Sequence, residues 1–253
     1  MDQLKLGLNR TATESLAQDL AACLVELDEI DADARRLLAG LEDARFNWSP
    51  GTSRWSIAQC LAHLDIVGRA YITVLDQAME RARAKSLFAQ APFHYGFLER
   101  WFVRSSEPPA GLRLRTPGPA RPSSEYFIEQ LPARFFTLQG ELRQRLHRAD
   151  GLDLARVKVA SPFVRTLKLG LGPCFQFLTA HERRHLWQAW QVRNCDSFPP
   201  ARARKPNPQL TPLSARCGIL ACGWDRSRGI GLLACAVTGP VEMPRSESDA
   251  HQH

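Results

Sequence analysis

Four long segments of this chain carry apolar residues at helical spacing, and this feature constrains the fold more than any other. Leucine, valine or phenylalanine recurs every three or four residues, which is typical of amphipathic helices that bury one face. The segments cover about residues 11–41, 56–85, 123–148 and 173–193. Strand propensity is weak outside the C-terminal region. The pattern therefore predicts an all-α protein built as a four-helix bundle.

Two of the expected helices have recognisable starts. Ser56 precedes the second helix, where its hydroxyl can cap a free backbone N–H while Gln59 reaches back to the Ser56 N–H. Pro173 suits the first turn of the fourth helix. The second helix has a wide apolar face that includes Cys60, His63 and Val67, so we expect this face to be buried.

The connections between the helices differ in kind. Residues 86–122 form a long, proline-rich link, and a link of this length in a compact domain is typical of a crossover or a lid. It contains the string FHYGFLERWFV, which predicts a short helix on the end of the bundle. Residues 151–172 are expected to form a loop. We expect these two connections to lie at the mouth of the bundle and to set substrate choice.

The chain changes character after Cys195. Residues 196–253 are rich in proline, glycine and arginine and lack apolar periodicity. We therefore expect a bundle domain over residues 1–195 and a disordered tail over residues 196–253. Cys217, Cys222 and Cys235 lack paired CxxC spacing, which argues against a zinc site in the tail.

The overall charge does not indicate a polyanionic partner. The net charge is +7, but lysines and arginines are mixed with acidic residues along the helical patterns. No basic motif interleaved with aromatic residues is present, so we expect no nucleic-acid binding. No apolar run is long enough for a bilayer, and the N-terminus lacks a secretory signal. With seven irregularly spaced cysteines, these features predict a cytoplasmic protein with free thiols and no membrane contact.

The fourth expected helix contains the string HERRH, which places His181 and His185 one turn apart on one face. His63 lies on the apolar face of the second helix, so three imidazoles can face one bundle interior. Burying them costs free energy unless they find partners, and a shared divalent metal satisfies all three. Imidazole suits Zn, Ni, Fe or Mn, so the choice of metal stays open. Four further histidines lie at positions less suited to a metal: His94, His147, His251 and His253.

Three neutral histidines leave one coordination position open for water or a thiol, as in a catalytic metal site. Gln188 is a candidate to fix a histidine tautomer, and Tyr71, two turns past His63, is a candidate to reach the open position. The string HERRH also fits the HExxH pattern of zinc proteases, in which Glu182 would be the general base. However, no third ligand follows downstream, and we expect Glu182 to lie on the surface.

Two strings resemble the DinB/YfiT-like family. WSPGTSRWSIAQCLAHLDIVGRAY is similar to the start of the family's second helix, and LTAHERRHLWQAWQVR is similar to its last core helix. The resemblance covers about residues 11–194. It implies a four-helix bundle, frequent homodimers, and a divalent metal held by three histidines that match His63, His181 and His185. Gln59 stands where many members carry glutamate, and the tail has no counterpart in the family.

Family members include metal-dependent hydrolases and thiol-dependent transferases. The resemblance therefore implies an enzyme that acts on a small molecule and uses water or a low-molecular-weight thiol as nucleophile. Two alternatives stay open. The first is a bundle that binds a metal or small ligand without catalysis, since a fold does not guarantee a reaction. The second is a structural helical protein whose histidines are hydrogen-bonded in the core.

Overall fold

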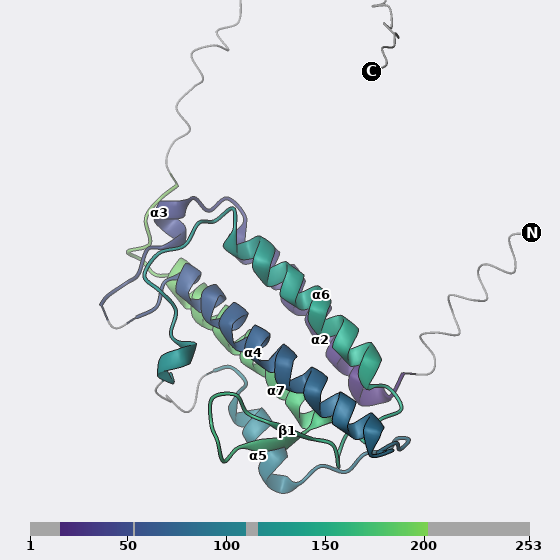
Figure 1. The fold of residues 1–253 in the computed structure, drawn as a ribbon. Coiled ribbons are helices and arrows are strands. Elements are labelled where there is room, and N and C mark those ends of the chain that lie inside the picture. Colours follow the sequence, from purple (N-terminus) through teal and green to yellow (C-terminus); the bar gives the residue numbers. More distant parts are fainter. Residues whose placement is uncertain (1–15, 53, 110–115, 202–253) are drawn as a thin grey trace, which may run out of the picture. The chain divides into compact units, whose positions relative to one another are not determined.

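Four long helices form the bundle in a computed structural model that describes residues 16–52, 54–109 and 116–201 (Figure 1). They are α2 (Gln18–Leu38), α4 (Ile57–Ala84), α6 (Leu131–Ala149) and α7 (Leu171–Arg193). Three shorter elements are α3 (Asp43–Phe46), α5 (Phe97–Ser105) and the 3₁₀ turn η1 (Gly118–Ala120). The predicted all-α, four-helix class is confirmed.

The chain crosses the length of the bundle between α4 and α6, because these two helices begin at the same end. This end carries α3. The Tyr126 backbone N–H, shortly before α6, donates to Asn47 Oδ1 at 2.9 Å, and α4 begins ten residues after Asn47. Beyond the end of α7, the Phe198 ring packs edge-on against Trp48 at a centroid distance of 5.4 Å. The long 86–122 connection is therefore the predicted crossover.

The start of α4 follows the predicted capping pattern. Ser56 Oγ accepts the Gln59 N–H at 3.1 Å, and Gln59 Oε1 accepts the Ser56 N–H at 3.0 Å. The expected wide apolar face is buried and forms the centre of the core. Gly68 on this face lies against Leu138 of α6, where a Cβ atom would clash with the leucine side chain, so the missing side chain allows α4 and α6 to approach closely.

Ion pairs connect α4 with α6. Asp65 of α4 is 1% exposed and accepts hydrogen bonds from Arg69 on its own helix and from Arg134 on α6. Asp76 of α4 similarly binds Arg145 and Arg148 of α6. A buried carboxylate needs such partners, because leaving one charge unpaired inside the protein is strongly destabilising. These pairs hold α4 and α6 side by side.

The third helix begins later than expected. The sequence pattern predicts helix from residue 123, whereas α6 starts at Leu131. Pro132 provides the reason, because its ring would clash with the carbonyl four residues upstream if the helix continued in that direction. Phe127, whose spacing from Leu131 and Phe135 would place it on the buried face of such a helix, is 65% exposed. The segment before α6 is instead held by α3, where Asp43 Oδ1 accepts the Ile128 N–H at 2.7 Å.

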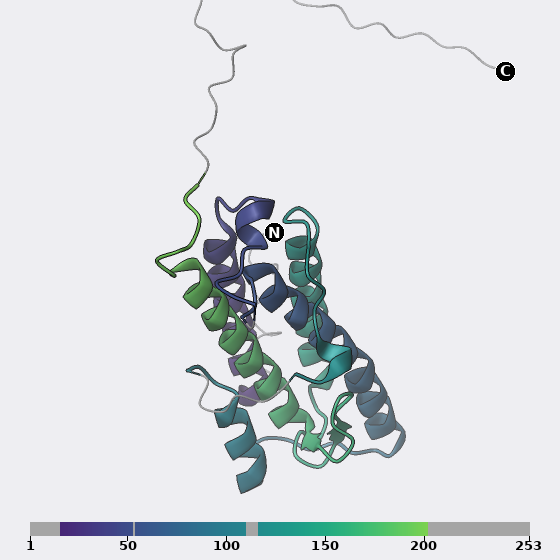
Figure 2. The ribbon, with the colours of Figure 1, turned by 90° about the vertical axis from the view of Figure 1, so that its left-hand side faces the viewer.

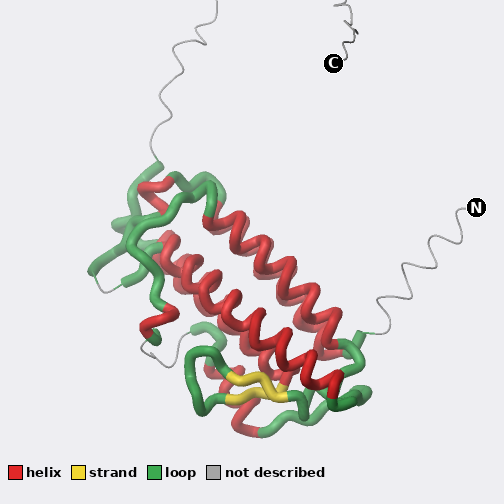
Figure 3. Tube along the Cα trace, in the orientation of Figure 1, coloured by secondary structure: helices red, strands yellow, loops and turns green. Residues whose placement is uncertain are grey.

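The 151–172 connection, expected to be a loop, contains a two-stranded antiparallel sheet (Figure 3). Strand β1 (Lys158–Ala160) pairs with β2 (Lys168–Gly170), and Val159 lies opposite Leu169. Both of these side chains are buried, so the hairpin covers one end of the bundle. The short helix expected from FHYGFLERWFV is α5, which lies beside α7 (Figure 2).

Some predictions fall on residues outside the described part of the chain. These are residues 11–15 of the first expected helix and residues 202–253 of the expected tail. Residues just after position 195 are attached to the bundle, since Arg45 Nε donates to the Pro199 carbonyl at 3.0 Å. The described thiols are free, as predicted: Cys23, Cys60, Cys174 and Cys195. None of the helices in the described ranges is long and apolar enough to cross a membrane.

Candidate metal centre

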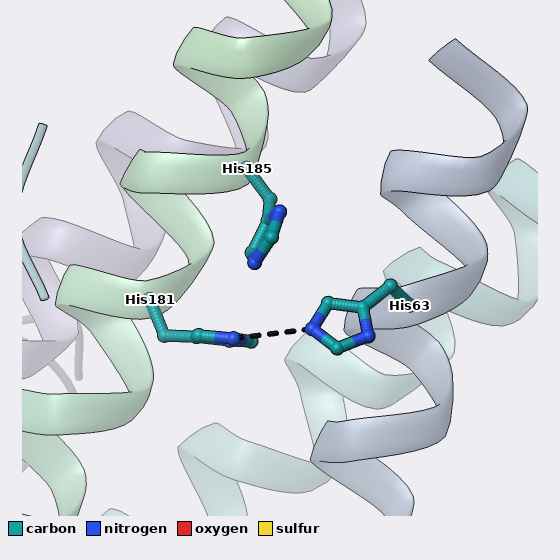
Figure 4. Close-up of side chains that lie close together, drawn as sticks. All are labelled: His63, His181 and His185. Atoms are coloured by element: carbon teal, nitrogen blue, oxygen red, sulfur yellow. Dashed lines mark hydrogen bonds between the residues drawn. The ribbon is translucent and has the colours of Figure 1, made fainter. Parts of the chain in front are cut away.

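Three histidines from two helices meet inside the bundle. His63 comes from α4, and His181 and His185 come from successive turns of α7, which packs against α4 (Figure 4). One ring nitrogen from each residue lies within 4.8 Å of the corresponding nitrogens of the other two. Ligands of a tetrahedral zinc ion, at about 2.1 Å from the metal, lie about 3.4 Å apart. Side-chain shifts on the order of 1 Å therefore convert this cluster into a coordination site.

In the His63 and His185 rings, a hydrogen bond at Nδ1 fixes which ring nitrogen carries the hydrogen. His63 Nδ1 lies 2.7 Å from the carbonyl oxygen of Ala120 in η1, and His185 Nδ1 lies 3.1 Å from Gln188 Oε1. Both oxygens are acceptors, so each Nδ1 carries the hydrogen and donates it. Each Nε2 then keeps its lone pair, and this is the tautomer in which histidine binds a metal.

The contact between His63 and His181 can hold either a shared hydrogen or a cation. Their Nε2 atoms face each other at 3.3 Å. His63 Nε2 presents a lone pair, because its proton is on Nδ1. A lone pair at this distance from a second ring nitrogen is stabilised by a proton or by a cation between the two atoms. The cluster therefore fits a divalent ion, and its three histidines form a group that can hold one.

Burial keeps the imidazoles neutral. His63 and His185 are 5% and 9% exposed, and His181 is partly buried. Burial lowers the pKa of His63 and lowers that of His185 to about 3, where the neighbouring His63 and Arg184 add to the effect. Burial and the other two rings hold the pKa of His181 well below its ordinary value. All three rings are therefore uncharged at neutral pH, each with one nitrogen lone pair available to a metal.

Aromatic rings form two walls of the site. Trp55 stacks on His185 at a centroid distance of 5.6 Å and contacts His63 at 4.9 Å. Phe177 contacts His181 at 5.5 Å on the other side. The sequence predictions did not include Trp55, although it directly precedes the Ser56 cap in the string that resembles the family. They also missed the Ala120 carbonyl, because a backbone atom from a distant loop leaves no sequence signal.

Of the three candidate catalytic residues, Tyr71 and Glu182 direct their polar atoms away from the histidine cluster. The Tyr71 hydroxyl donates to Ser161 Oγ at 3.2 Å, and its ring contacts Phe163 and Phe177 rather than a histidine. Gln188 Oε1 instead lies beside a ligand ring, 3.1 Å from His185 Nδ1.

The prediction that Glu182 lies on the surface is wrong. It is 3% exposed, and its Oε1 accepts a hydrogen bond from Gln139 Nε2 of α6 at 2.9 Å. A helix turns by about 100° per residue, so the side chain after His181 points across the bundle and not toward α4. Burial raises the pKa of Glu182 to about 8. The HExxH interpretation therefore lacks its general base at the histidine cluster.

The remaining histidines within the described ranges, His94 and His147, are exposed and lie apart from this cluster. His251 and His253 lie outside the described residues.

One comparison with known proteins identifies the family of this chain. No curated protein and no solved structure matches the chain. A family model, that of the DinB superfamily, matches residues 26–189, which include α4, α6 and all three histidines. The match covers more than half of the chain, and so this protein belongs to the DinB superfamily.

Proposed function

We propose that the protein is a metal-dependent enzyme that binds one divalent ion, Zn, Ni, Fe or Mn, through His63, His181 and His185. The observation that carries this proposal is the convergence of three neutral imidazoles, two of which are held by hydrogen bonds in the ligand tautomer. An ion bound there would lower the pKa of a coordinated water or thiol and so supply a nucleophile at neutral pH. The substrate class is a small molecule, and the reaction is hydrolysis or transfer to a low-molecular-weight thiol.

The protein's own residues orient the site and limit its exposure to water. The Ala120 carbonyl and Gln188 hold two ligand rings in fixed orientations. Trp55 covers the His63 and His185 rings on one side. Phe177 covers part of the His181 ring, which is partly buried.

The second candidate function is a metal-binding bundle without catalysis. The positions of Glu182 and Tyr71 favour this alternative, because their polar groups are bonded to Gln139 and Ser161 and do not reach the histidines. An enzyme of this design depends on the ion itself to activate the nucleophile. The two candidates therefore differ in turnover and not in metal content.

The test is metal analysis of full-length protein without a His tag, before and after reconstitution. Wild type is expected to hold about one equivalent, and His185→Ala to hold almost none. His147→Ala is the matched control, because His147 is exposed on α6 and is expected to leave the metal content unchanged. Wild type without metal after reconstitution would sink both candidates and leave the structural interpretation.

A positive metal result is followed by turnover assays. Ester and amide hydrolysis and transfer to small thiols are measured with loaded wild type and with His185→Ala that has gone through the same reconstitution. Metal-dependent turnover in wild type alone supports the enzyme, and stoichiometric metal without turnover supports the binding bundle.

A further inference from the structure

Helix α5 carries apolar side chains on two opposite faces. Its inner face packs on the bundle, where the Phe102 ring lies against Phe177 of α7 at a centroid distance of 5.1 Å. On the same face, Glu99 Oε1 accepts the Gly170 N–H at 2.7 Å and so ties α5 to the β1–β2 hairpin. The outer face of α5 presents three large apolar side chains, which are 72%, 75% and 55% exposed: Phe97, Leu98 and Trp101.

Arginines flank these outer side chains. A helix turns by about 100° per residue, so Phe97, Trp101 and Arg104 follow one stripe of α5, and Arg100 lies beside it. Both arginines are exposed. Aromatic and leucine side chains bordered by basic residues are typical of helices that lie in the plane of a membrane surface.

The end of the molecule formed by α5 and the hairpin is basic (Figure 1). Within residues 86–109 and 151–172, six basic residues are all exposed: Arg100, Arg104, Arg156, Lys158, Arg165 and Lys168. The three carboxylates of these two ranges already have partners within the protein, since Glu99 pairs with Lys158, Asp153 with Arg156 and Glu107 with Arg183. Four basic side chains are thus left without an acidic partner among the described residues. Their charge complements an anionic surface.

We infer that the outer face of α5 binds the surface of an anionic lipid bilayer, with its apolar side chains at the level of the headgroups. This inference goes beyond the proposed function and does not depend on the metal. The expectation of no membrane contact rested on the lack of a spanning segment, which a helix lying on the surface does not need. A second copy of this chain is a poorer occupant, because a symmetric contact would bring the same arginines against each other.

The test is co-sedimentation of full-length protein with large lipid vesicles. Vesicles of phosphatidylcholine and phosphatidylglycerol in equal parts are compared with vesicles of phosphatidylcholine alone. Wild type is expected to bind the anionic vesicles at least about tenfold more strongly, because several basic residues lie near the lipid surface. This preference is expected to fall as added salt screens the charges.

Two double variants separate the apolar face from the rest of the chain. Leu98→Ser with Trp101→Ser is expected to lose at least about tenfold of the affinity for anionic vesicles, because both apolar side chains are removed from the interface. Val25→Ser with Phe127→Ser is the matched control, since these residues are 59% and 65% exposed outside α5, and it is expected to bind like wild type. A third variant, Arg100→Gln with Arg104→Gln, is expected to bind more weakly and with less dependence on salt.

Circular dichroism establishes that each variant is folded. Wild type that does not bind anionic vesicles, or a Leu98→Ser, Trp101→Ser variant that binds like wild type, overturns the inference. Gel filtration with light scattering tests the other occupant. A wild-type dimer that becomes a monomer only in this variant would assign the outer face of α5 to a second copy and would also overturn the inference. Metal content is measured separately, so these outcomes leave the proposed function standing.

Discussion

Neighbouring residues of α7 belong to two buried polar clusters. These clusters differ in the partner that satisfies their polar atoms. The histidine cluster lies between α7 and α4, and the pair of Glu182 and Gln139 reaches from α7 to α6 across the centre of the bundle. The histidines direct ring nitrogens toward one another, an arrangement that can hold a cation. The Glu182–Gln139 pair is instead satisfied by a proton, because two of its oxygen atoms lack a hydrogen-bond partner.

The two unsatisfied oxygen atoms are Glu182 Oε2 and Gln139 Oε1, which have no hydrogen-bond partner among the described residues. Because burial raises the pKa of Glu182 to about 8, its carboxyl group carries a proton at neutral pH. The proton makes Oε2 a donor, while Gln139 Oε1 is an acceptor. The first cluster is therefore suited to an external ligand, whereas the second is a structural contact of the core.

The largest effect is expected when His181 and Glu182 are replaced separately. Excess Zn²⁺ stabilises the folded wild type, by about 2.7 kcal/mol at a concentration one hundred times the Kd. His181→Ala removes a ligand and is expected to lose this stabilisation, whereas Glu182→Gln keeps it. The measurement is Tm by differential scanning fluorimetry as a function of Zn²⁺, starting from chelator-treated protein. Loss of the Zn²⁺ shift in Glu182→Gln would show that the two clusters are not separate.

Loss of the amide partner of Glu182 is expected to destabilise the core. Gln139→Leu leaves a buried carboxyl group without its hydrogen bond, which costs about 1–3 kcal/mol of unfolding free energy. Urea denaturation of metal-free protein measures this. Gln144→Leu is the control, because Gln144 is exposed on the same helix and is expected to change stability by less than about 0.5 kcal/mol. Equal stability of Gln139→Leu and wild type would contradict the structural role of the pair.

A smaller effect is expected at Gln188. Gln188→Leu removes the acceptor for His185 Nδ1–H and frees the ring to rotate, so metal affinity is expected to fall about 10–100-fold. Competition with a chromogenic chelator measures the Kd. Gln176→Leu, at a half-buried position of the same helix, is expected to keep the wild-type affinity. If both variants bind metal like wild type, Gln188 does not position His185.

The smallest expected effect is the change of folding stability with pH. The raised pKa of Glu182 means that the native protein keeps a proton which the unfolded chain loses above about pH 4.5. Stability is therefore expected to fall as pH rises toward 8, by at most about 1.4 kcal/mol per pH unit. The lowered histidine pKa values act oppositely, because the unfolded chain takes up protons below about pH 6.5 and stability falls as pH falls.

The window from about pH 6.5 to 8 therefore isolates Glu182. Urea denaturation of metal-free Glu182→Gln is expected to give a flatter profile there than wild type, since an amide does not titrate. The same slope in both proteins would contradict the assignment of a retained proton to Glu182.

Local sequence patterns predicted most of the helical framework. The Ser56 cap and the apolar stripe of α4 are recognisable because both arise from interactions within one helix. The same stripe argument failed ahead of α6, because Pro132 prevents helix upstream even where apolar residues have helical spacing. The β1–β2 hairpin was missed because its strands are only three residues long and depend on packing against the bundle.

The sequence by itself determined that His181 and His185 share one face of α7, because helix geometry alone sets that relation. It also determined that His63 lies on an apolar face. Only the tertiary structure decided that these faces meet, that the Ala120 carbonyl fixes the His63 tautomer, and that Glu182 points into the core. Contacts of this kind join residues dozens of positions apart, and they depend on how the helices pack and where the crossover runs.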